Sequence, residues 1–475
     1  MRPIECSKFL RTSAACPPQS AAMQRSVSTS AASYGKQPER YAVIGGGIAG
    51  LAAAWHLLAA RRDAPDCPAV SLHLYEAHGL GAGGSGAAAG LLHPYTPRGK
   101  LLWRGMEAFA DALFLTAAAE SAAAKAAAAA GETADPFTWH HGILRPARSI
   151  KQARDLARFL PLNADAAAAA GAELLDGPAM AQLVPGLQPD LLLPGLAAEA
   201  AACRQAAMAG LMVREAVVLN PVSYMGALWT GCCQAAAETG GGAELRRESV
   251  RSLAALEEQA GPYDGMVLAA GAAVETVAEA TGLLPLELCQ GHTLHMRPGS
   301  SNSDGRQQHD AACSSNFWPA SAPSLLGSPY IAAHGRDSLV VGATKAYGLT
   351  PDQAYAQCAA PVVTDLTEAA TATEALLPPA AALWPPLSSW RVTVVVSGVR
   401  ALPTRGADGS IPYLGRLPAA GSSGQQRNWW LVGGLGARGL VYHAWLGRLV
   451  ARALLLRSEE GLPPELLRWK TAVQN

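Results

Sequence analysis

The spacing of hydrophobic positions changes within one stretch of the chain, YAVIGGGIAGLAAAWHLLAA, residues 41–60. Residues 41–44 are a short apolar run that predicts a β-strand, and three glycines at 45–47 then interrupt it. From Ile48 onward the apolar residues recur at helical spacing. The stretch is uncharged and about 20 residues long, the length of a membrane span. Its strand, glycine turn and helix argue against a span, and no other credible span occurs in the sequence.

A second strand is predicted where apolar residues alternate in VSLHLYE, residues 70–76. The glycines of the first turn fit G-x-G-x-x-G at Gly45, Gly47 and Gly50. In that pattern the first glycine permits a tight turn, the second lets the backbone approach a pyrophosphate, and the third lets helix and strand pack closely. Glu76, at the end of the second strand, is placed to accept hydrogen bonds from a ribose. Together these features predict a dinucleotide site.

The hydrophobic pattern predicts the other helices and strands less clearly. Residues 105–130 and 150–172 predict alanine-rich helices, and residues 286–297 and 338–344 predict strands. Segment 298–325 has no periodicity and is longer than ordinary connections. We expect a disordered insertion there, although Phe317 and Trp318 leave a lid as an alternative.

Composition describes a globular chain of 475 residues, half of them hydrophobic and 16% charged, with a formal net charge of zero. Residues 1–39 carry five basic and two acidic side chains, so the remainder is mildly acidic and shows no obvious footprint for a polyanion. The nine cysteines form no C-x-x-C pair, which argues against a disulfide framework or a zinc site. No metal is expected.

The first 39 residues are rich in serine, alanine and arginine and poor in acids, and they lack the apolar core of a secretory signal. This composition is typical of an organellar transit peptide, and the excess of serine and alanine favours the chloroplast over the mitochondrion. A merely disordered tail has the same composition, so the alternative stays open.

Five later segments carry a family resemblance. They are GLGAGGSGAAAGLLHPYTPRGK at 79–100, YDGMVLAAGA at 263–272, SGVR at 397–400, DGSIPYLG at 408–415 and WWLVGGLGARGL at 429–440. With the fingerprint and Glu76, they resemble the D-amino-acid-oxidase-type FAD-dependent oxidoreductases, which include glycine and sarcosine oxidases. GLGARG is most similar to the oxidoreductase domain of a bacterial enzyme that modifies the tRNA wobble uridine. The resemblance covers roughly residues 40–460.

This resemblance implies an α/β fold with two interleaved domains. A Rossmann-like FAD-binding domain of the glutathione-reductase type would take residues 40–100, 205–290 and 395–460. An α+β substrate domain with a mostly antiparallel sheet would take residues 101–204 and 291–394. Residues 461–475 would form a C-terminal tail.

The resemblance also implies which residues bind FAD. The expected set is Gly45, Gly46, Gly47, Ile48, Ala49, Gly50, Glu76, Ser85, Gly86, Ala88, Ala89, Gly90, Leu91, Val250, Ala270, Gly271, Gly434, Leu435, Gly436, Ala437, Arg438 and Gly439. Small residues suit a loop whose backbone passes close to the cofactor. Family members with covalent flavin attach it through a cysteine near the late G-x-R segment. Residues 398–415 contain none, so we expect non-covalent FAD.

Four residues are candidates for the chemistry. Arg400 falls where the family often binds a substrate carboxylate, and a guanidinium fork suits a carboxylate; a structural pair with Asp408 is the alternative. Arg438 begins the C-terminal helix and could stabilise the negative charge that develops on reduced flavin. Tyr330 and His93 are weaker candidates, because such residues are as often structural.

The implied activity is oxidation of the C–N bond of a small amino acid or secondary amine, with hydride transfer to FAD and oxygen as the expected electron acceptor. Two alternatives remain open. One is demodification of carboxymethylaminomethyl-uridine in tRNA, which GLGARG favours and the acidic body disfavours. The other is a non-enzymatic organellar assembly factor of the same fold, which the presence of Arg400 disfavours.

Overall fold

The computed structural model describes residues 37–64, 67–188, 208–299, 317–406, 408–418 and 426–472. Two sequence predictions therefore fall mostly outside the described residues. These are the transit peptide, of which only residues 37–39 are described, and the insertion at 298–325, of which residues 300–316 are not described.

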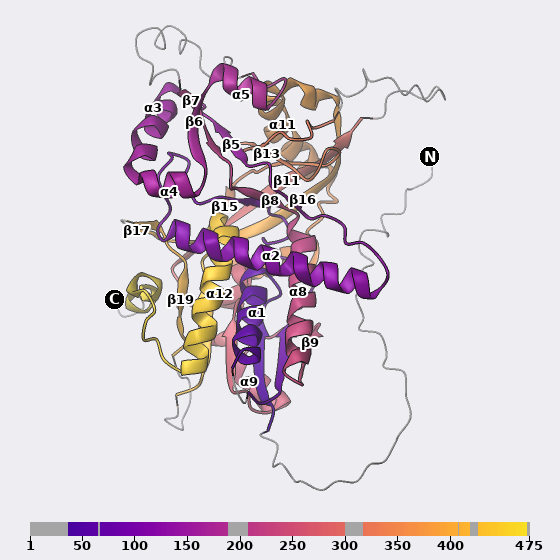
Figure 1. Ribbon diagram of the computed structural model, residues 1–475. Helices are drawn as coiled ribbons and strands as arrows, with labels where there is room; N and C mark the ends of the chain where they lie inside the picture. Colours follow the sequence, from indigo (N-terminus) through magenta and orange to yellow (C-terminus); the bar gives the residue numbers. More distant parts are fainter. Residues whose placement is uncertain are drawn as a thin grey trace. The chain divides into compact units, whose positions relative to one another are not determined.

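The first sheet has six strands in the order β19-β20-β10-β1-β2-β9, and its edge strands β19 and β9 are labelled in Figure 1. All neighbours in it are parallel except β19 and β20, which are antiparallel. The parallel strands are short and largely apolar, as strands covered on both faces are. Their bounds are β1 Glu39–Ile44, β2 Val70–Tyr75, β9 Gly242–Arg246, β10 Gly265–Leu268, β19 Tyr413–Arg416 and β20 Trp429–Gly433.

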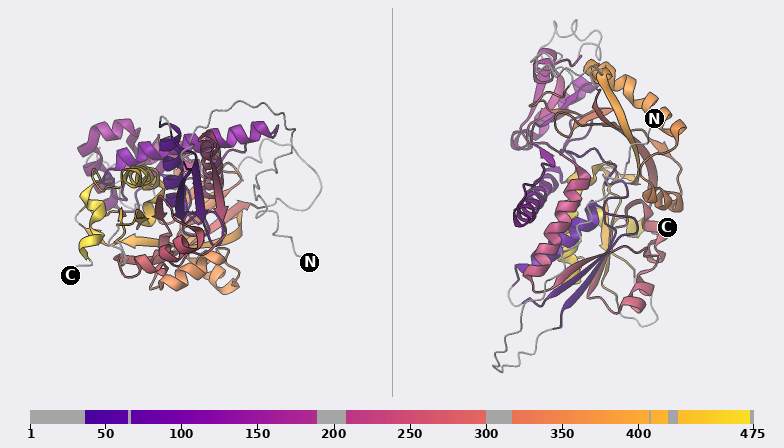
Figure 2. Two further views of the ribbon diagram at one scale, coloured as in Figure 1. Left: turned by 90° about the horizontal axis from the view of Figure 1, so that it is seen from below. Right: turned by 90° about the vertical axis from the view of Figure 1, so that its right-hand side faces the viewer.

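Helices cover this sheet on both faces. Helices α1 (Ile48–Arg62), α8 (Pro221–Glu238) and α12 (Gly439–Leu456) pack together on one face, and α2 (Gly105–Ala129) crosses over them (Figure 2). Side chains of alternate strand positions, Tyr41 and Val43 among them, join the core of that face. Ala42 and Ile44 point the other way, into a core with α9 (Leu253–Ala260) and the 3₁₀ turns η4 (Gly271–Thr276) and η5 (Ala278–Ala280).

The second sheet has nine strands in the order β15-β11-β14-β13-β12-β5-β7-β6, with β16 paired to β11. Its pairs are antiparallel except β5 with β12. The longest pair is β11 with β16, in which Cys289 lies opposite Arg400 and Gly291 opposite Gly398. The bounds are β5 Ile143–Pro146, β6 Ala172–Asp176, β7 Met208–Val213, β11 Leu286–Pro298, β12 Ser324–Leu325, β13 Tyr330–Ala333, β14 Leu339–Gly342, β15 Ala346–Tyr347 and β16 Trp390–Pro403.

Smaller elements complete the described part. A three-stranded sheet joins β3 (Leu91–Leu92), β8 (Val217–Leu219) and β4 (Thr138–Trp139), and β17 (Arg405–Gly406) pairs with β18 (Gly409–Ser410). The remaining helices are α3 Ile150–Phe159, α4 Ala164–Ala169, α5 Gly177–Leu183, α10 Pro351–Ala359, α11 Leu366–Leu383 and α13 Trp469–Ala472. The other 3₁₀ turns are η2 Leu160–Asn163, η7 Pro385–Ser389, η8 Gly436–Arg438 and η9 Pro464–Leu467.

The strands of the first sheet come from the three segments expected to bind FAD, beginning one residue early at Glu39. One strand differs from the expected division. Residues 205–290 were assigned to the FAD-binding domain, yet β7 pairs with β5 and β6 in the second sheet. Strands β11 and β16 run through the predicted boundaries at 290/291 and 394/395, because each is a single long strand. The domain limits themselves stay a prediction.

Three local expectations also differ. The helix predicted at 150–172 is broken into α3, a 3₁₀ turn and α4, with Pro161 at the break. The segment expected as a C-terminal tail contains η9 and α13, and Trp469 is 1% exposed. Trp318 is buried against Trp384, with ring centroids 4.7 Å apart, so it belongs to the core and not to a lid.

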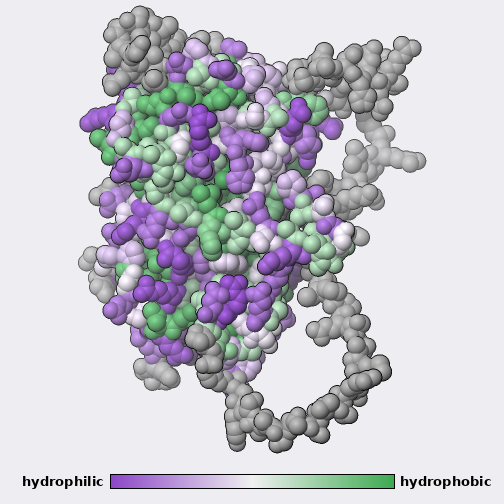
Figure 3. Space-filling view, in the orientation of Figure 1, coloured by the Kyte–Doolittle hydropathy of each residue, from purple (hydrophilic) through white to green (hydrophobic). Residues whose placement is uncertain are grey.

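Within the described part of the chain, no helix has the length and apolar character needed to cross a membrane. The twenty-residue run that opens with Tyr41 is a buried strand and a buried helix. Hydrophilic and hydrophobic residues are interspersed on the face that α2 crosses (Figure 3). Phe114 on α2 is one of the few large apolar side chains exposed there.

Candidate active site

Backbone contacts require glycine at Gly45 in the turn from β1 to α1 and at Gly50 in the first turn of α1. Gly45 has φ +113°, a conformation that side chains disfavour, and an added Cβ would lie 2.4 Å from the carbonyl oxygen of Ala269. A Cβ at Gly50 would lie 2.0 Å from the carbonyl oxygen of Gly45. The residue at the N-cap, Gly47, has no side chain to bond the first turn of α1. The helix N-terminus is therefore open to an anion.

Glu76 follows β2 and bonds the same turn. One of its carboxylate oxygens accepts a hydrogen bond of 2.8 Å from the backbone N–H of Gly46, and the other accepts one of 3.0 Å from that of His78. The carboxylate thus fixes the turn and also faces the cavity. An acid at this position is the one expected to bind a ribose.

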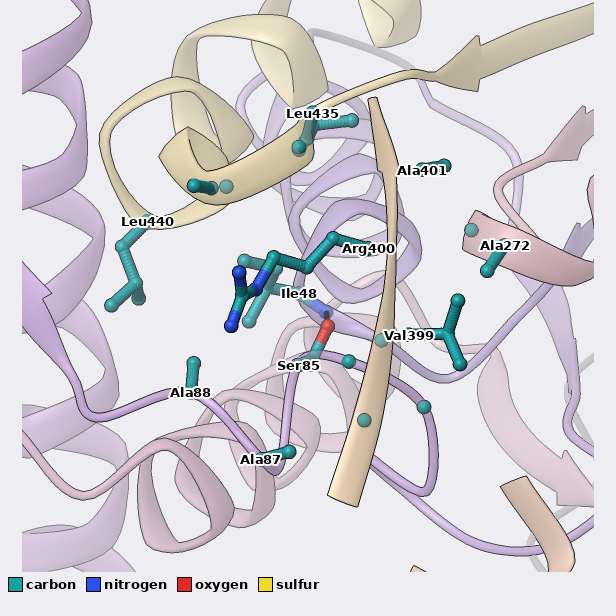
Figure 4. Close-up of a pocket in the computed structure, with 18 of the residues that line it drawn as sticks. Ile48, Ser85, Ala87, Ala88, Ala272, Val399, Arg400, Ala401, Leu435 and Leu440 are labelled. Carbon is teal, nitrogen blue, oxygen red and sulfur yellow. Dashed lines mark hydrogen bonds between the residues drawn. The ribbon is translucent and has the colours of Figure 1, made fainter. Parts of the chain in front are cut away.

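The loop at 79–90 passes beside the start of α1. The hydroxyl of Ser85 accepts a hydrogen bond of 3.3 Å from the backbone N–H of Ile48 (Figure 4). Gly90 has φ +82°, and a Cβ there would lie 1.6 Å from the carbonyl oxygen of Leu219. The small residues of this loop are thus required by close backbone contacts as well as by any ligand.

These elements surround a cavity of about 790 Å³, within the size range of small-molecule and cofactor sites. It is lined by most of the residues expected to bind FAD: Gly45, Gly47, Ile48, Ala49, Glu76, Ser85, Ala88, Ala89, Gly90, Leu91, Val250, Ala270, Gly271, Gly434, Leu435, Gly436, Ala437, Arg438 and Gly439. Gly46, Gly50 and Gly86 do not line it. Each instead makes a close backbone contact within the turn or the loop.

The four candidate catalytic residues line the same cavity. Arg400 comes from β16, and its side chain lies over Gly291 of the neighbouring strand, where a Cβ would be 2.3 Å from Nη2 of Arg400. Its guanidinium points into the space between Ser85, Ala88 and Leu440 (Figure 4). Among the described residues Arg400 forms no ion pair with Asp408.

Arg438 ends the 3₁₀ turn η8 and is the N-cap residue of α12. Burial lowers its pKa; the nearby Tyr442 acts against this shift, and the positive charge of Arg405 adds to it. The group remains a cation at neutral pH, since the ordinary pKa of arginine is above 12.

His93 and Tyr330 are both uncharged at neutral pH. Burial, with the positive charges of Arg145 and Arg438, lowers the pKa of His93 to about 3. Its Nδ1 accepts a hydrogen bond of 3.3 Å from the backbone N–H of Tyr95. Burial raises the pKa of Tyr330 to about 12, against the effect of Arg400. Neither side chain is poised to exchange a proton near pH 7 in this environment.

Sequence reasoning missed several residues of the cavity: Tyr95, Arg145, Arg148, Lys345, Tyr355 and Cys358. For one of them a signal was present. Arg145 is a lone basic residue in the otherwise apolar strand ILRP, and it is 7% exposed. Buried arginines are uncommon unless paired, so a single arginine inside an apolar strand marks a candidate site.

The residues present fit FAD. The glycine turn brings backbone against the cavity, the open N-terminus of α1 suits a pyrophosphate, and Glu76 stands at the end of β2. These features define a class of protein, the Rossmann-type dinucleotide-binding proteins.

The particular family follows from comparison with known proteins. A model of the FAD dependent oxidoreductase family matches residues 40–453, and the chain belongs to this family. FAD is accordingly its cofactor. A search of curated protein sequences gave no match.

Solved structures show the same fold. Glycine oxidase from Geobacillus kaustophilus has a TM-score of 0.61 at 19% identity, over 90% of this chain and 98% of that one. Iminodiacetate oxidase from Chelativorans sp. BNC1 has a TM-score of 0.59 at 19% identity, with the same coverage. L-Proline dehydrogenase from P. horikoshii has a TM-score of 0.59 at 13% identity, over 92% and 99% of the two chains.

Proposed function

We propose that this oxidoreductase oxidises the C–N bond of a small amino acid or secondary amine whose carboxylate is bound by Arg400. The observation that carries the proposal is the Arg400 guanidinium, which points into the FAD cavity and is not neutralised by an acid of the described chain. A planar fork of this kind binds a carboxylate by two parallel hydrogen bonds. The names of the similar structures, which include an oxidase of glycine and one of iminodiacetate, support the same substrate class.

FAD would supply the two-electron chemistry by accepting a hydride from the substrate carbon next to nitrogen. The chain's own residues bind and orient the substrate. Among the described residues that line the cavity, the acids are Glu76, which bonds the fingerprint turn, and the exposed Glu248. The basic groups outnumber them, so the cavity disfavours an ammonium ion. The substrate amine would bind in its neutral form, which is the form that can release a hydride.

Arg438 and the two uncharged side chains have distinct places in this proposal. Arg438, beside the N-terminus of α12, would stabilise negative charge that develops on the cofactor. His93 and Tyr330 would hold polar atoms of the substrate without exchanging protons.

The cofactor would be held without a covalent bond. Cys358 is the described cysteine that lines the cavity. Its thiol donates to the carbonyl oxygen of Ala354 over 3.3 Å, and burial raises its pKa to about 11, so it is protonated and a poor nucleophile. Oxygen as electron acceptor and a chloroplast location remain predictions.

Anaerobic flavin reduction tests the proposal. We would screen glycine, sarcosine, D-amino acids, proline and N-carboxymethyl amines for bleaching of the flavin absorbance. Arg400→Met should lower the rate of reduction by about 10² to 10³-fold, because a charged, bidentate contact is lost at about 3–4 kcal/mol. FAD content should be unchanged.

Arg391→Met is the matched control, since Arg391 is an exposed arginine of the same strand β16. The flavin of Arg391→Met should be reduced by the amine at the same rate as that of the unmodified enzyme. Bound FAD that none of these amines reduces, or full activity in Arg400→Met, would refute the proposal.

A further inference from the structure

A second group of cationic and polar side chains lines the cavity and is not used by the proposed reaction. Its members are Arg145 on β5, Arg148 in the loop after β5, and Tyr95 in the loop after β3. We call them the Arg145 cluster. What they share is hydrogen-bonding capacity that the described residues do not satisfy.

Arg145 is the most unusual of them. Its side chain is 7% exposed and lines the cavity, yet its guanidinium has no ion pair or hydrogen bond among the described residues. Burial lowers its pKa to about 10, so it still carries its charge at neutral pH. An unpaired buried charge is costly, and such groups are normally matched by an opposite charge. No described residue supplies the matching charge, and an anion that enters the cavity would supply it.

The other two members lack partners in the same way. Nη1 of Arg148 and the hydroxyl of Tyr95 are buried without a hydrogen-bond partner in the described residues, and both side chains line the cavity. Gln152 ties their segments together. Its Oε1 accepts a hydrogen bond of 2.9 Å from the backbone N–H of Arg148, and its Nε2 donates to the carbonyl oxygen of Pro97 over 3.0 Å.

The charges that act on His93, next to the cluster, are both positive. His93, beside Tyr95 in sequence, senses the positive charges of both Arg145 and Arg438, which lower its pKa further than burial alone does. The cavity acids are engaged elsewhere, Glu76 at the fingerprint turn and Glu248 at an exposed position after β9. The cluster thus offers two guanidinium groups and a phenol to an anion, with no competing carboxylate in the described lining.

We propose that the Arg145 cluster binds a second carboxylate of the substrate, so that the enzyme acts on amines that carry two carboxylates. This inference rests on the proposed function, in which Arg400 binds the first carboxylate. A guanidinium fork with a phenol is a suitable set of donors for a planar carboxylate. The substrate class is then an amino acid with an acidic side chain or an N-carboxyalkyl amino acid.

Matched pairs of compounds test it. N-propylglycine and N-(2-carboxyethyl)glycine differ only in a terminal methyl against a carboxylate, and norvaline and glutamate differ in the same way. In at least one pair the dicarboxylate should reduce the flavin with a KM at least tenfold lower. A second readout needs no reaction: glutarate should perturb the flavin spectrum of the holoenzyme at concentrations at least tenfold below those of pentanoate.

Variants locate the effect. Arg145→Met and Arg148→Met should each remove the preference for the dicarboxylate. The KM for the monocarboxylate of the same pair should stay nearly unchanged. Arg145→Lys, which keeps the charge and loses the fork, should retain part of it. Arg98→Met is the control, because Arg98 is exposed and already paired with Asp155, and it should leave the preference intact.

Stability provides a further check. Arg145→Met should not lower the thermal unfolding temperature of the holoenzyme without ligand, because it removes an unpaired buried charge. Glutarate should raise that temperature in the unmodified enzyme and not in the variant.

Three outcomes would overturn the inference. The first is reduction by monocarboxylates with no advantage for their dicarboxylate partners, which would leave the proposed function standing. The second is loss of FAD from Arg145→Met but not from Arg98→Met, which would show that Arg145 binds the cofactor and not the substrate. The third is a preference that survives both substitutions in the cluster. Binding of glutarate that depends on Arg145, with no amine reducing the flavin, would instead uphold the anion site and refute the proposed reaction.

Discussion

The fingerprint region and the arginine-lined region form one cavity by different means. The fingerprint region, which comprises strands β1 and β2, helix α1 and the loop at 79–90, relies on backbone: Gly45, Gly50 and Gly90 leave no space for a Cβ. The arginine-lined region, strands β5, β11 and β16, relies on long side chains that cross the cavity wall, Arg145 and Arg400 above all. The first region is fixed before any ligand enters, whereas the second retains guanidinium groups without partners in the described chain.

This difference separates what is general from what is specific. Close backbone packing around a turn suits any dinucleotide and carries no information about the substrate. The number and position of unpaired guanidinium groups depend on the anion to be bound. Substrate identity is therefore to be sought in the second sheet, whereas the first sheet indicates only that a dinucleotide is bound.

The largest effect is expected in the fingerprint region, from Gly50→Ala. The added methyl would lie 2.0 Å from the carbonyl oxygen of Gly45, a backbone atom that cannot move away without opening the turn. We expect loss of bound FAD by at least 10²-fold, or loss of soluble protein. The measurement is the FAD content and dissociation constant of the purified protein.

Gly226→Ala is the matched control, since Gly226 also lies in a helix, α8, and has open space around it. It should bind FAD normally and gain up to about 1 kcal/mol of stability. Normal FAD affinity in Gly50→Ala would show that the turn is not set by this contact.

The two regions also differ in how many of their site residues could be predicted from the sequence. The strand–glycine–helix unit, Glu76 and the glycine-rich segments have fixed spacings, so the cofactor, the fold class and the glycine-rich part of the cavity lining were predictable. Tyr355 and Cys358, which line the cavity on the same side, were not.

Arg400 could be placed because it stands in a family-like motif. Arg145 had one signal, its place in the apolar strand ILRP, but its burial appears only when β5 is packed against the rest of the chain. Arg148 had no signal in the sequence, because its importance arises from a buried atom without a partner.

The strand boundaries show the same limit. Strand β7 looks from sequence like part of the segment between the Rossmann-like units, and only its pairing with β5 and β6 places it in the second sheet. Pairing between strands far apart in sequence is not written in the local hydrophobic pattern.

A smaller effect should come from two histidines whose pKa values are lowered, His443 on α12 and His93 in the cavity wall. His443 on α12 is 0% exposed; its Nε2 lies 2.7 Å from the hydroxyl of Tyr224 on α8, and burial lowers its pKa to about 4. His93, on the arginine-lined side, has a pKa of about 3. Both values lie below the unfolded value of about 6.5, so the unfolded chain binds more protons as the pH falls and stability is lost from pH 6.5 downward.

We expect the free energy of unfolding of the FAD-saturated enzyme to fall by about 2 kcal/mol per histidine between pH 7 and pH 5. His443→Leu and His93→Leu should each remove the pH-dependent loss of stability that comes from the substituted histidine. His443→Leu should also cost about 1 kcal/mol at pH 7, because it removes the 2.7 Å hydrogen bond between His443 and the buried hydroxyl of Tyr224, which keeps its hydrogen bond with Thr116. Urea unfolding at pH 5, 6 and 7 measures both effects, and an unchanged pH dependence in either variant would contradict the assignment.

The smallest effect tests whether the arginine-lined region is as adaptable as its side chains suggest. Gly291→Ala would place a methyl 2.3 Å from Nη2 of Arg400 and 2.9 Å from the carbonyl oxygen of Thr344. Because the first of these atoms ends a flexible side chain, the fold and FAD binding should survive while the guanidinium is displaced. We expect KM for the substrate to rise about tenfold, near 1.4 kcal/mol, with a smaller change in kcat. Gly242→Ala on β9, with open space around it, should change neither constant. If Gly291→Ala instead released FAD, the arginine-lined region would be as rigid as the fingerprint turn, and the contrast between the two regions would be wrong.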